Sequence, residues 1–136
     1  MKKNLLVLKE TMEEVDKTWD FTPLISILSD NVVFEATIRE GTPISGQFKG
    51  KKAVSDYFMK ILPATAVFKQ QAPMEFVAHD DKVIILGDDA YTLKKNNRTF
   101  RSPYAMIVTF DRGLITKILI IQDLSGFLEV YRNNVN

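Results

Sequence analysis

The stretch that decides the fold is KVIILGDDAYTLKKNNRTFRSPYAMIVTFDRGLITKILIIQD, residues 82–123. It holds three segments rich in β-branched and aromatic residues, at 82–94, 98–111 and 114–123. Only two or three residues separate one segment from the next. Turns this short join neighbouring strands that run in opposite directions. We therefore predict an antiparallel meander of long strands in the C-terminal half.

A further extended segment precedes this meander. Residues 66–79 are predicted to form one long strand, which makes four long strands in all. Pro73 lies inside this segment and has no N–H to donate to a neighbouring strand. We expect Pro73 to mark an edge, a bulge or a bend.

The N-terminal half is predicted to be mainly helical. Apolar residues recur at helical spacing over residues 5–19 and again over 51–62, where Pro63 is expected to end the helix. Between them we expect a short helix capped by Thr22, with Pro23 at its first position. Two strands, at residues 32–37 and 44–48, are predicted between the second and third helices.

Length and composition are those of an ordinary globular protein. The chain has 136 residues, and we expect a single α+β domain over residues 1–136, with helices packed on an antiparallel sheet. The 18 basic and 17 acidic residues are interspersed and leave a net charge of +1. This balance argues against nucleic acid or an anionic membrane as a partner.

The sequence also restricts the cellular compartment that we expect and the kinds of chemistry that are possible. It contains no cysteine, which excludes disulfides, thiolate nucleophiles and cysteine-ligated metals. The apolar run near the N-terminus stops at Lys9-Glu10, short of a signal peptide, and no segment approaches a membrane helix. We expect a cytoplasmic protein that uses no cofactor and no metal.

Five short motifs follow one another along the chain. They are Trp-Asp-Phe at 19–21, Val-Phe-Glu-Ala at 33–36, Gly-Gln-Phe-Lys-Gly-Lys-Lys-Ala-Val at 46–54 ahead of Tyr57-Phe58, Phe-Asp-Arg-Gly-Leu-Ile at 110–115, and Gln-Asp-Leu-Ser-Gly at 122–126. In this order and spacing they resemble the nuclear transport factor 2-like superfamily, and within it the SnoaL-like and ketosteroid-isomerase-related proteins. The resemblance covers nearly the whole chain. It implies a cone-shaped fold, in which three helices from the N-terminal half pack on a strongly bent antiparallel sheet around an apolar cavity.

The resemblance also implies what the cavity lacks. Ketosteroid isomerases use an aspartate base, and they use a tyrosine and a protonated aspartate as an oxyanion hole. The matching positions here hold Ala36, Met12 and Met106, which cannot exchange a proton or donate to an enolate. SnoaL-like cyclases use an acid in the pocket, and the residue that best matches it is Asp123. Tyr104 is then the candidate hydrogen-bond donor.

The other acidic and imidazole side chains have simpler explanations. His79 is expected at a solvated hairpin end, and Glu35 is expected to face away from the cavity. Asp88 and Asp89 are adjacent in a strand, so their side chains diverge and only one can face the cavity. The sequence leaves open which of the two it is. Asp123 has its own alternative, as a cap of a short helix that follows it.

Three functions remain open at this point. The first is a domain that binds a small apolar or aromatic molecule, as a homodimer formed through the outer sheet face. The second is a cofactor-free lyase, isomerase or cyclase that uses Asp123 and a tyrosine, either Tyr104 or Tyr91. The third is a protein-interaction module that uses the outer sheet face. For the first two, the residues predicted to line the cavity are Trp19, Phe34, Ala36, Tyr57, Phe58, Tyr91, Tyr104 and Met106.

Overall fold

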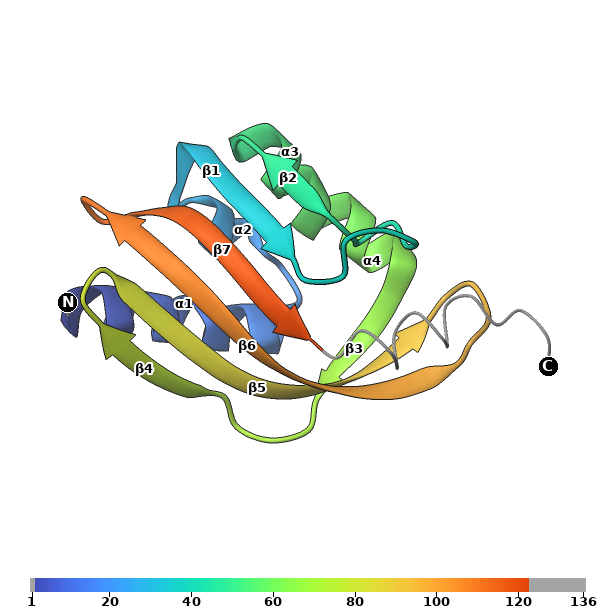
Figure 1. Cartoon of the computed structure of the whole chain (residues 1–136). Helices are drawn as coiled ribbons and strands as arrows, with labels where there is room; N and C mark the ends of the chain where they lie inside the picture. The colour runs from blue at the N-terminus through green and yellow to red at the C-terminus, as the bar shows by residue number, and fades with distance from the viewer. Residues whose placement is uncertain (1, 123–136) are drawn as a thin grey trace.

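The computed structural model describes residues 2–122. The helices are α1 (Lys2–Thr18), α2 (Thr22–Ile25), α3 (Lys51–Asp56), the π-helical segment η1 (Tyr57–Ile61) and α4 (Leu62–Thr65). The strands are β1 (Leu28–Ala36), β2 (Gln47–Lys49), β3 (Ala66–Gln70), β4 (Glu75–His79), β5 (Lys82–Leu93), β6 (Thr99–Asp111) and β7 (Leu114–Gln122). Figure 1 shows the long strands bending around the helices. The predicted α+β architecture, with N-terminal helices on a bent sheet, is confirmed.

The seven strands form one sheet in the order β2-β1-β7-β6-β5-β3, and β4 also pairs with β5. The segment expected to form one strand at 66–79 therefore forms two, β3 and β4. Both pair with β5, along successive parts of its length. Pro73 lies in the gap between them, where no N–H is needed for pairing. The predicted meander of β5, β6 and β7 is confirmed.

The sheet is mixed, which corrects the expectation of a wholly antiparallel one. β1 and β7 pair in parallel, with Phe34 opposite Ile118 and Ala36 opposite Ile120. The sequence could not reveal this pairing, because short turns fix only the direction of strands that follow one another. Here α3, η1, α4 and five strands intervene between the two partners.

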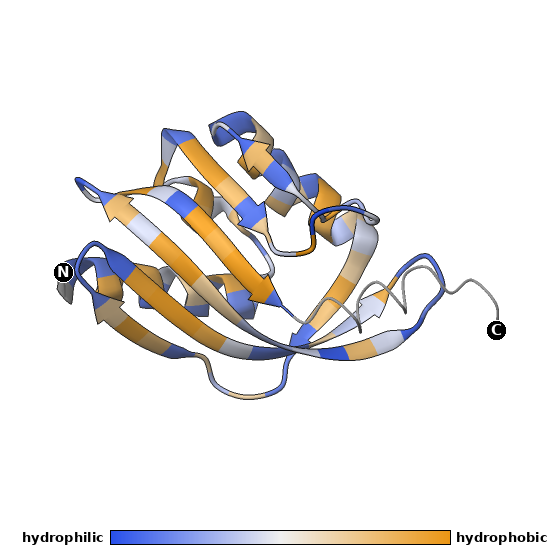
Figure 2. Cartoon of the chain, in the orientation of Figure 1, coloured by the Kyte–Doolittle hydropathy of each residue, from blue (hydrophilic) through white to orange (hydrophobic). Residues whose placement is uncertain are grey.

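The helices lie against the inner face of the sheet. α1 contacts β4 and β5, whereas α3 contacts β1 and β2. Alternate residues of β1, Val32, Phe34 and Ala36, are buried on this face with exposures of 0–2%. Figure 2 shows apolar residues along the long strands and hydrophilic residues at the hairpin ends. The core therefore lies between the helices and the sheet, as the strand pattern predicts.

The third helical region continues to Thr65, beyond the end predicted at Pro63. The N–H of Leu62 donates to the carbonyl of Tyr57, five residues earlier, which is the wide turn of a π-helix. This wide turn adjusts the helix just before Pro63, a residue that has no N–H to donate. It also accompanies the inward placement of two consecutive residues, Tyr57 and Phe58, which are 5% and 4% exposed.

The chain leaves α1 through a left-handed residue, Trp19, with φ of 62°. The cap of α2 differs from the prediction at Thr22. The Asp20 side chain accepts hydrogen bonds from the Thr22 backbone N–H at 2.9 Å and from its hydroxyl at 2.6 Å. Asp20 is therefore the residue that secures the start of α2. Within residues 2–122 no helix is long and apolar enough to cross a membrane.

Candidate functional site

A cavity lies between α1, η1 and the inner face of the sheet. It encloses about 70 Å³, and the whole hollow, including the space at its open mouth, is about 610 Å³. Six of the residues predicted to line a cavity do line this one: Phe34, Tyr57, Phe58, Tyr91, Tyr104 and Met106. The cavity is thus walled mainly by aromatic and apolar side chains, as ligand pockets usually are.

Two residues predicted to line the cavity do not do so. Trp19 is 52% exposed and packs outside the cavity on Phe68, with 4.9 Å between ring centroids. The left-handed turn at Trp19 carries its ring past the end of α1 instead of along the inner face. Ala36 is buried but short, and its backbone N–H bonds to the Gly46 carbonyl, so it belongs to the core. The predicted acid, Asp123, lies outside the described residues.

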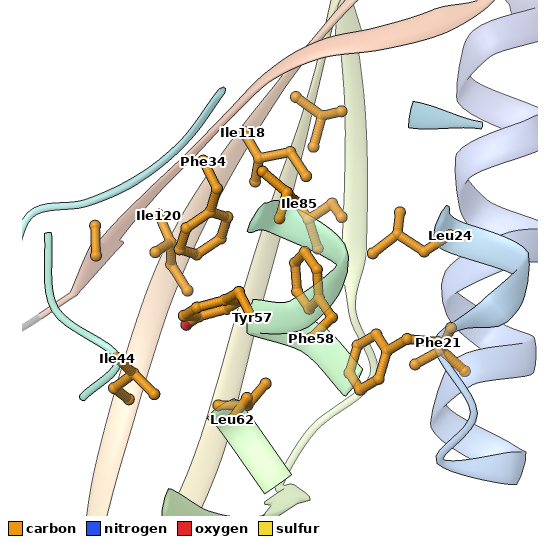
Figure 3. Packing of buried hydrophobic residues seen from close by; sticks show 14 of the residues in the cluster. Phe21, Leu24, Phe34, Ile44, Tyr57, Phe58, Leu62, Ile85, Ile118 and Ile120 are labelled. Carbon is orange, nitrogen blue, oxygen red and sulfur yellow. The ribbon is translucent and has the colours of Figure 1, made fainter. Parts of the chain in front are cut away.

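Four rings of the aromatic wall come from β1, from η1 and from the turn before α2. Phe34 of β1 lies 4.2 Å from Tyr57 of η1, and Phe21 stacks on Phe58 at 5.0 Å, measured between ring centroids. Figure 3 shows these four rings pointing toward one another, beside Ile120. Burial raises the pKa of Tyr57, so its hydroxyl is neutral at physiological pH. The π-helical segment places two of these four rings in the wall.

Asp89 is the acid that the structure places in this cavity. Its side chain points inward, with those of Val83, Ile85 and Tyr91 at the other odd positions of β5. Asp89 is 8% exposed, and among residues 2–122 its carboxyl has neither a hydrogen bond nor an ion pair. The side chain is therefore largely buried and has no partner among the described residues. Because no fully buried side-chain oxygen in residues 2–122 lacks a hydrogen bond, the carboxyl oxygens of Asp89 must still reach the open space of the hollow.

The surroundings of Asp89 change its acidity. Burial raises its pKa, and the nearby carboxylates of Asp16 and Asp88 raise it further, to about 6. Both effects disfavour the charged form. Asp88 itself faces the other way and pairs with Arg101 at 2.6 Å. The prediction that these adjacent acids diverge is confirmed, and the open choice between them falls on Asp89.

Two tyrosines flank Asp89 in the wall. Burial, then the charge of Asp89, raises the pKa of both Tyr91 and Tyr104, so both hydroxyls are protonated at neutral pH. The Tyr91 hydroxyl accepts a hydrogen bond from the Gln122 side-chain amide at 3.4 Å. Tyr104 pairs with Gly87 across the β5–β6 ladder, and its ring occupies the space that a side chain at 87 would need. The cavity thus places one buried carboxyl group near two neutral tyrosine hydroxyls.

The remaining candidates lie away from the cavity. His79 sits at the β4–β5 turn with 77% of its side chain exposed, 3.4 Å from Asp80, which confirms the predicted solvated hairpin end. Glu35 pairs with Arg39 at 3.7 Å and with Lys117 at 3.8 Å and does not line the cavity, as predicted. In the described part of the chain, no group of three side chains is arranged to hold a metal ion.

No protein-family model and no curated protein matches this sequence. Solved structures do match. An NTF2-like protein from Burkholderia xenovorans has a TM-score of 0.83 at 20% identity, over 97% of each chain. An NTF2-like protein of unknown function from Burkholderia pseudomallei also has a TM-score of 0.83, at 17% identity over 98% of this chain and 100% of that one.

A third matching structure is that of a protein crystallised with a small molecule. TerC, co-crystallised with polyporic acid, has a TM-score of 0.78 at 18% identity, over 96% of this chain and 98% of that one. The matches extend over nearly the full length of each chain, and they agree with the resemblance seen in the sequence motifs. The protein therefore has the α+β NTF2-like fold.

Proposed function

We propose that the protein binds a small molecule with an apolar or aromatic body in this cavity, and that Asp89 recognises the polar part of that molecule. The observation that carries the proposal is the Asp89 carboxyl, buried without a partner in the wall of an aromatic hollow. A few polar groups set in an apolar wall are what fix the orientation of a bound ligand.

This placement of Asp89 lowers the stability of the fold. A buried polar group without a hydrogen bond destabilises a fold by about 1–3 kcal/mol, and a charged group by more. A leucine or methionine at position 89 would avoid that cost. A bound molecule that donates to the carboxyl compensates for it instead. The co-crystallisation of TerC with polyporic acid supports the use of this fold for binding a small molecule.

Binding can be tested with aromatic fragments observed by NMR, with a variant that fills the cavity. Met106 points into the cavity, whereas the next residue, Ile107, does not line it. We expect Met106→Trp to abolish fragment binding and Ile107→Trp, the matched control, to retain it. Equal binding by the two variants would place the fragments elsewhere, and an absence of binding by the unmodified protein would refute the proposal.

A second candidate function is cofactor-free acid–base catalysis, by an isomerase, cyclase or lyase. The specific observation in its favour is a carboxyl group with a pKa of about 6 beside the neutral Tyr104 hydroxyl. A base is most effective when its pKa lies near the working pH. In this mechanism Asp89 takes the role predicted for Asp123: it removes a proton from carbon, while Tyr104 donates to the oxygen that gains charge.

Hydrogen–deuterium exchange at carbon tests this second function directly. Small aromatic ketones would be incubated in D₂O with the unmodified protein and with Asp89→Asn. Catalysed exchange next to the carbonyl, lost in the variant, is the expected result. Ketones that bind in the cavity but exchange no faster than in buffer would exclude catalysis and leave binding as the function.

The outer sheet face supports a homodimer as a further proposal. Three apolar side chains, Val77, Leu86 and Ile121, are 41–49% exposed, and Leu86 and Ile121 flank Ala105 in neighbouring strands. A contiguous apolar surface of this kind on a sheet favours association with a second copy. Sedimentation should give a dimer, and Leu86→Lys should give a monomer; an unmodified protein that sediments as a monomer at high concentration would contradict this.

A further inference from the structure

The distribution of charge around the cavity indicates its ligand class, and we infer that the ligand is a positively charged apolar molecule, a protonated amine on an aromatic or aliphatic body. This inference rests on the proposed binding function and makes it more specific. It follows from three independent features of the wall: the sign of its charges, their positions, and the aromatic rings at its mouth.

The charges that line the cavity are all negative. Asp16 and Asp89 contribute carboxylates, and no lysine, arginine or histidine is among the described residues of the wall. The adjoining surface groove contains Glu13, Asp16 and Lys17, so it too carries more negative than positive charge. An anionic ligand entering here would meet repulsion and find no cation to pair with.

The two carboxylates act on the same space from opposite elements. Asp16, on α1, is exposed at the mouth, whereas Asp89, on β5, is buried in the wall. They are close enough for the charge of Asp16 to raise the pKa of Asp89. A cation held between them would relieve this repulsion and give the Asp89 carboxylate the partner that it lacks.

The aromatic rings favour the same ligand. Phe68 lines the cavity and packs against the exposed Trp19 ring at the mouth, and Tyr91 lies 5.9 Å from Phe68 between ring centroids. The faces of such rings carry partial negative charge and attract ammonium groups. The apolar rest of the molecule would then pack against Phe21 and Phe58, which also line the cavity and are buried.

Four titratable groups act on the surroundings of Asp89. Asp16 faces it from α1, Asp88 precedes it in β5 on the opposite face, and Tyr91 and Tyr104 flank it. The tyrosines are neutral at physiological pH, because burial raises their pKa. The electrostatic field at the site is therefore set by carboxylates, and it weakens when Asp89 is protonated, below about pH 6.

Three probes that differ in charge but share a ring and a two-carbon chain test the inference: 2-phenylethylamine, 2-phenylethanol and phenylacetate. The amine stays protonated at neutral pH, as a lysine side chain does. Calorimetry at low salt would compare the unmodified protein with Asp89→Asn and with Asp88→Asn, the adjacent acid on the other face. We expect the amine to bind at least about tenfold more tightly than the alcohol, and phenylacetate to bind most weakly.

The variants then assign the preference to one residue. Asp89→Asn should remove the advantage of the amine and leave the binding of the alcohol, whereas Asp88→Asn, which removes a charge outside the cavity, should retain most of that advantage. If Asp89→Asn does not fold, the unmodified protein still gives an answer, because its affinity for the amine should fall below about pH 6 while its affinity for the alcohol should not.

The outcomes separate this inference from the function on which it rests. If the alcohol or the acid binds as tightly as the amine, the inference is wrong, although the cavity remains a binding site. If none of the three probes binds, the binding function itself fails and the inference fails with it. An amine preference that survives Asp89→Asn would place the cation elsewhere and overturn the inference.

Discussion

Gly87 of β5 and Tyr104 of β6 are direct partners in the sheet, and the Tyr104 ring covers the glycine where any other residue would have a side chain. The absence of a side chain at 87 lets the hydroxyl end of the ring lie against the strand, two positions before Asp89. Gly87 therefore helps to set where the Tyr104 hydroxyl stands in the cavity wall.

Gly87→Ala is expected to lower the free energy of unfolding by about 1–3 kcal/mol, because the new methyl group overlaps the Tyr104 ring. In a Tyr104→Ala background the same change should cost much less, since the ring is gone. Urea unfolding of the four proteins in this cycle measures the coupling. An equal cost of Gly87→Ala in both backgrounds would contradict the contact.

Asp89→Asn is expected to stabilise the protein at neutral pH. The pKa of Asp89 is raised to about 6 in the fold, so the native state binds this proton more tightly than the unfolded state does. The free energy of unfolding should therefore fall as the pH rises from about 4 to about 6. Asparagine removes this effect, and we expect a gain of roughly 1–3 kcal/mol at pH 7 that vanishes toward pH 4.

Asp88→Asn is the matched control for that experiment. Asp88 carries the same group on the opposite face, but it is paired with Arg101 at 2.6 Å. Its loss should lower the free energy of unfolding by about 0.2–1 kcal/mol, the usual range for an exposed pair. Denaturant unfolding across pH 4–8 distinguishes the two variants, because the free energy of unfolding should rise in Asp89→Asn and fall in Asp88→Asn. A loss of stability at pH 7 in Asp89→Asn would mean that the charge of Asp89 is compensated in the fold.

Much of the fold could be predicted from the sequence, because local rules govern it. The short turn at Arg112-Gly113 and the apolar strands on each side define the β6–β7 hairpin without further information. Trp19 shows where local rules stop. Helical spacing assigns it to the apolar face of α1, but the backbone turns left-handed at that residue and moves the ring outward.

The site could be predicted only in part, and Asp89 shows why. Tyr91 is predicted to line the cavity, and Asp89, two residues earlier, lies on the same face of β5, so that prediction already implies an inward Asp89. The neighbouring residues Ile84 and Leu86 are also apolar and lie on the other face. A strand that is apolar on both faces does not reveal which one is inside.

The β6–β7 turn offers a stabilising substitution. Arg112 has φ of 53° and Gly113 has φ of 83°, as in the tight turns where asparagine and glycine are favoured. Arg112 is highly exposed, and its ion pair with Asp111 is long, at 3.9 Å. Arg112→Asn should raise the free energy of unfolding by about 0.4–1 kcal/mol. Arg112→Val should lower the free energy of unfolding, because a β-branched residue resists the left-handed conformation. Thermal unfolding of the unmodified protein and both variants measures the two changes.

A side-chain hydrogen bond of Thr37 connects the end of β1 to the end of β7. Loss of this bond should be visible by hydrogen exchange. The Thr37 hydroxyl accepts a hydrogen bond from the Gln122 backbone N–H at 3.1 Å. Thr37→Val keeps the shape of the side chain but removes the acceptor, so exchange of the Gln122 amide should accelerate severalfold. Thr116→Val in β7, the control, should leave that amide unchanged. Unchanged exchange in Thr37→Val would show that the bond does not protect this end of the strand.

The parallel pairing of β1 with β7 also affects how the protein is made. Thr37 and Gln122, at the ends of these strands, are 85 positions apart. A ribosome adds about 5–20 residues per second, so β7 is complete only roughly 4–17 seconds after β1 has been synthesised. Throughout that interval the β1 edge can pair with a strand of another nascent chain. The speed of translation therefore sets how long each new molecule is open to misassembly.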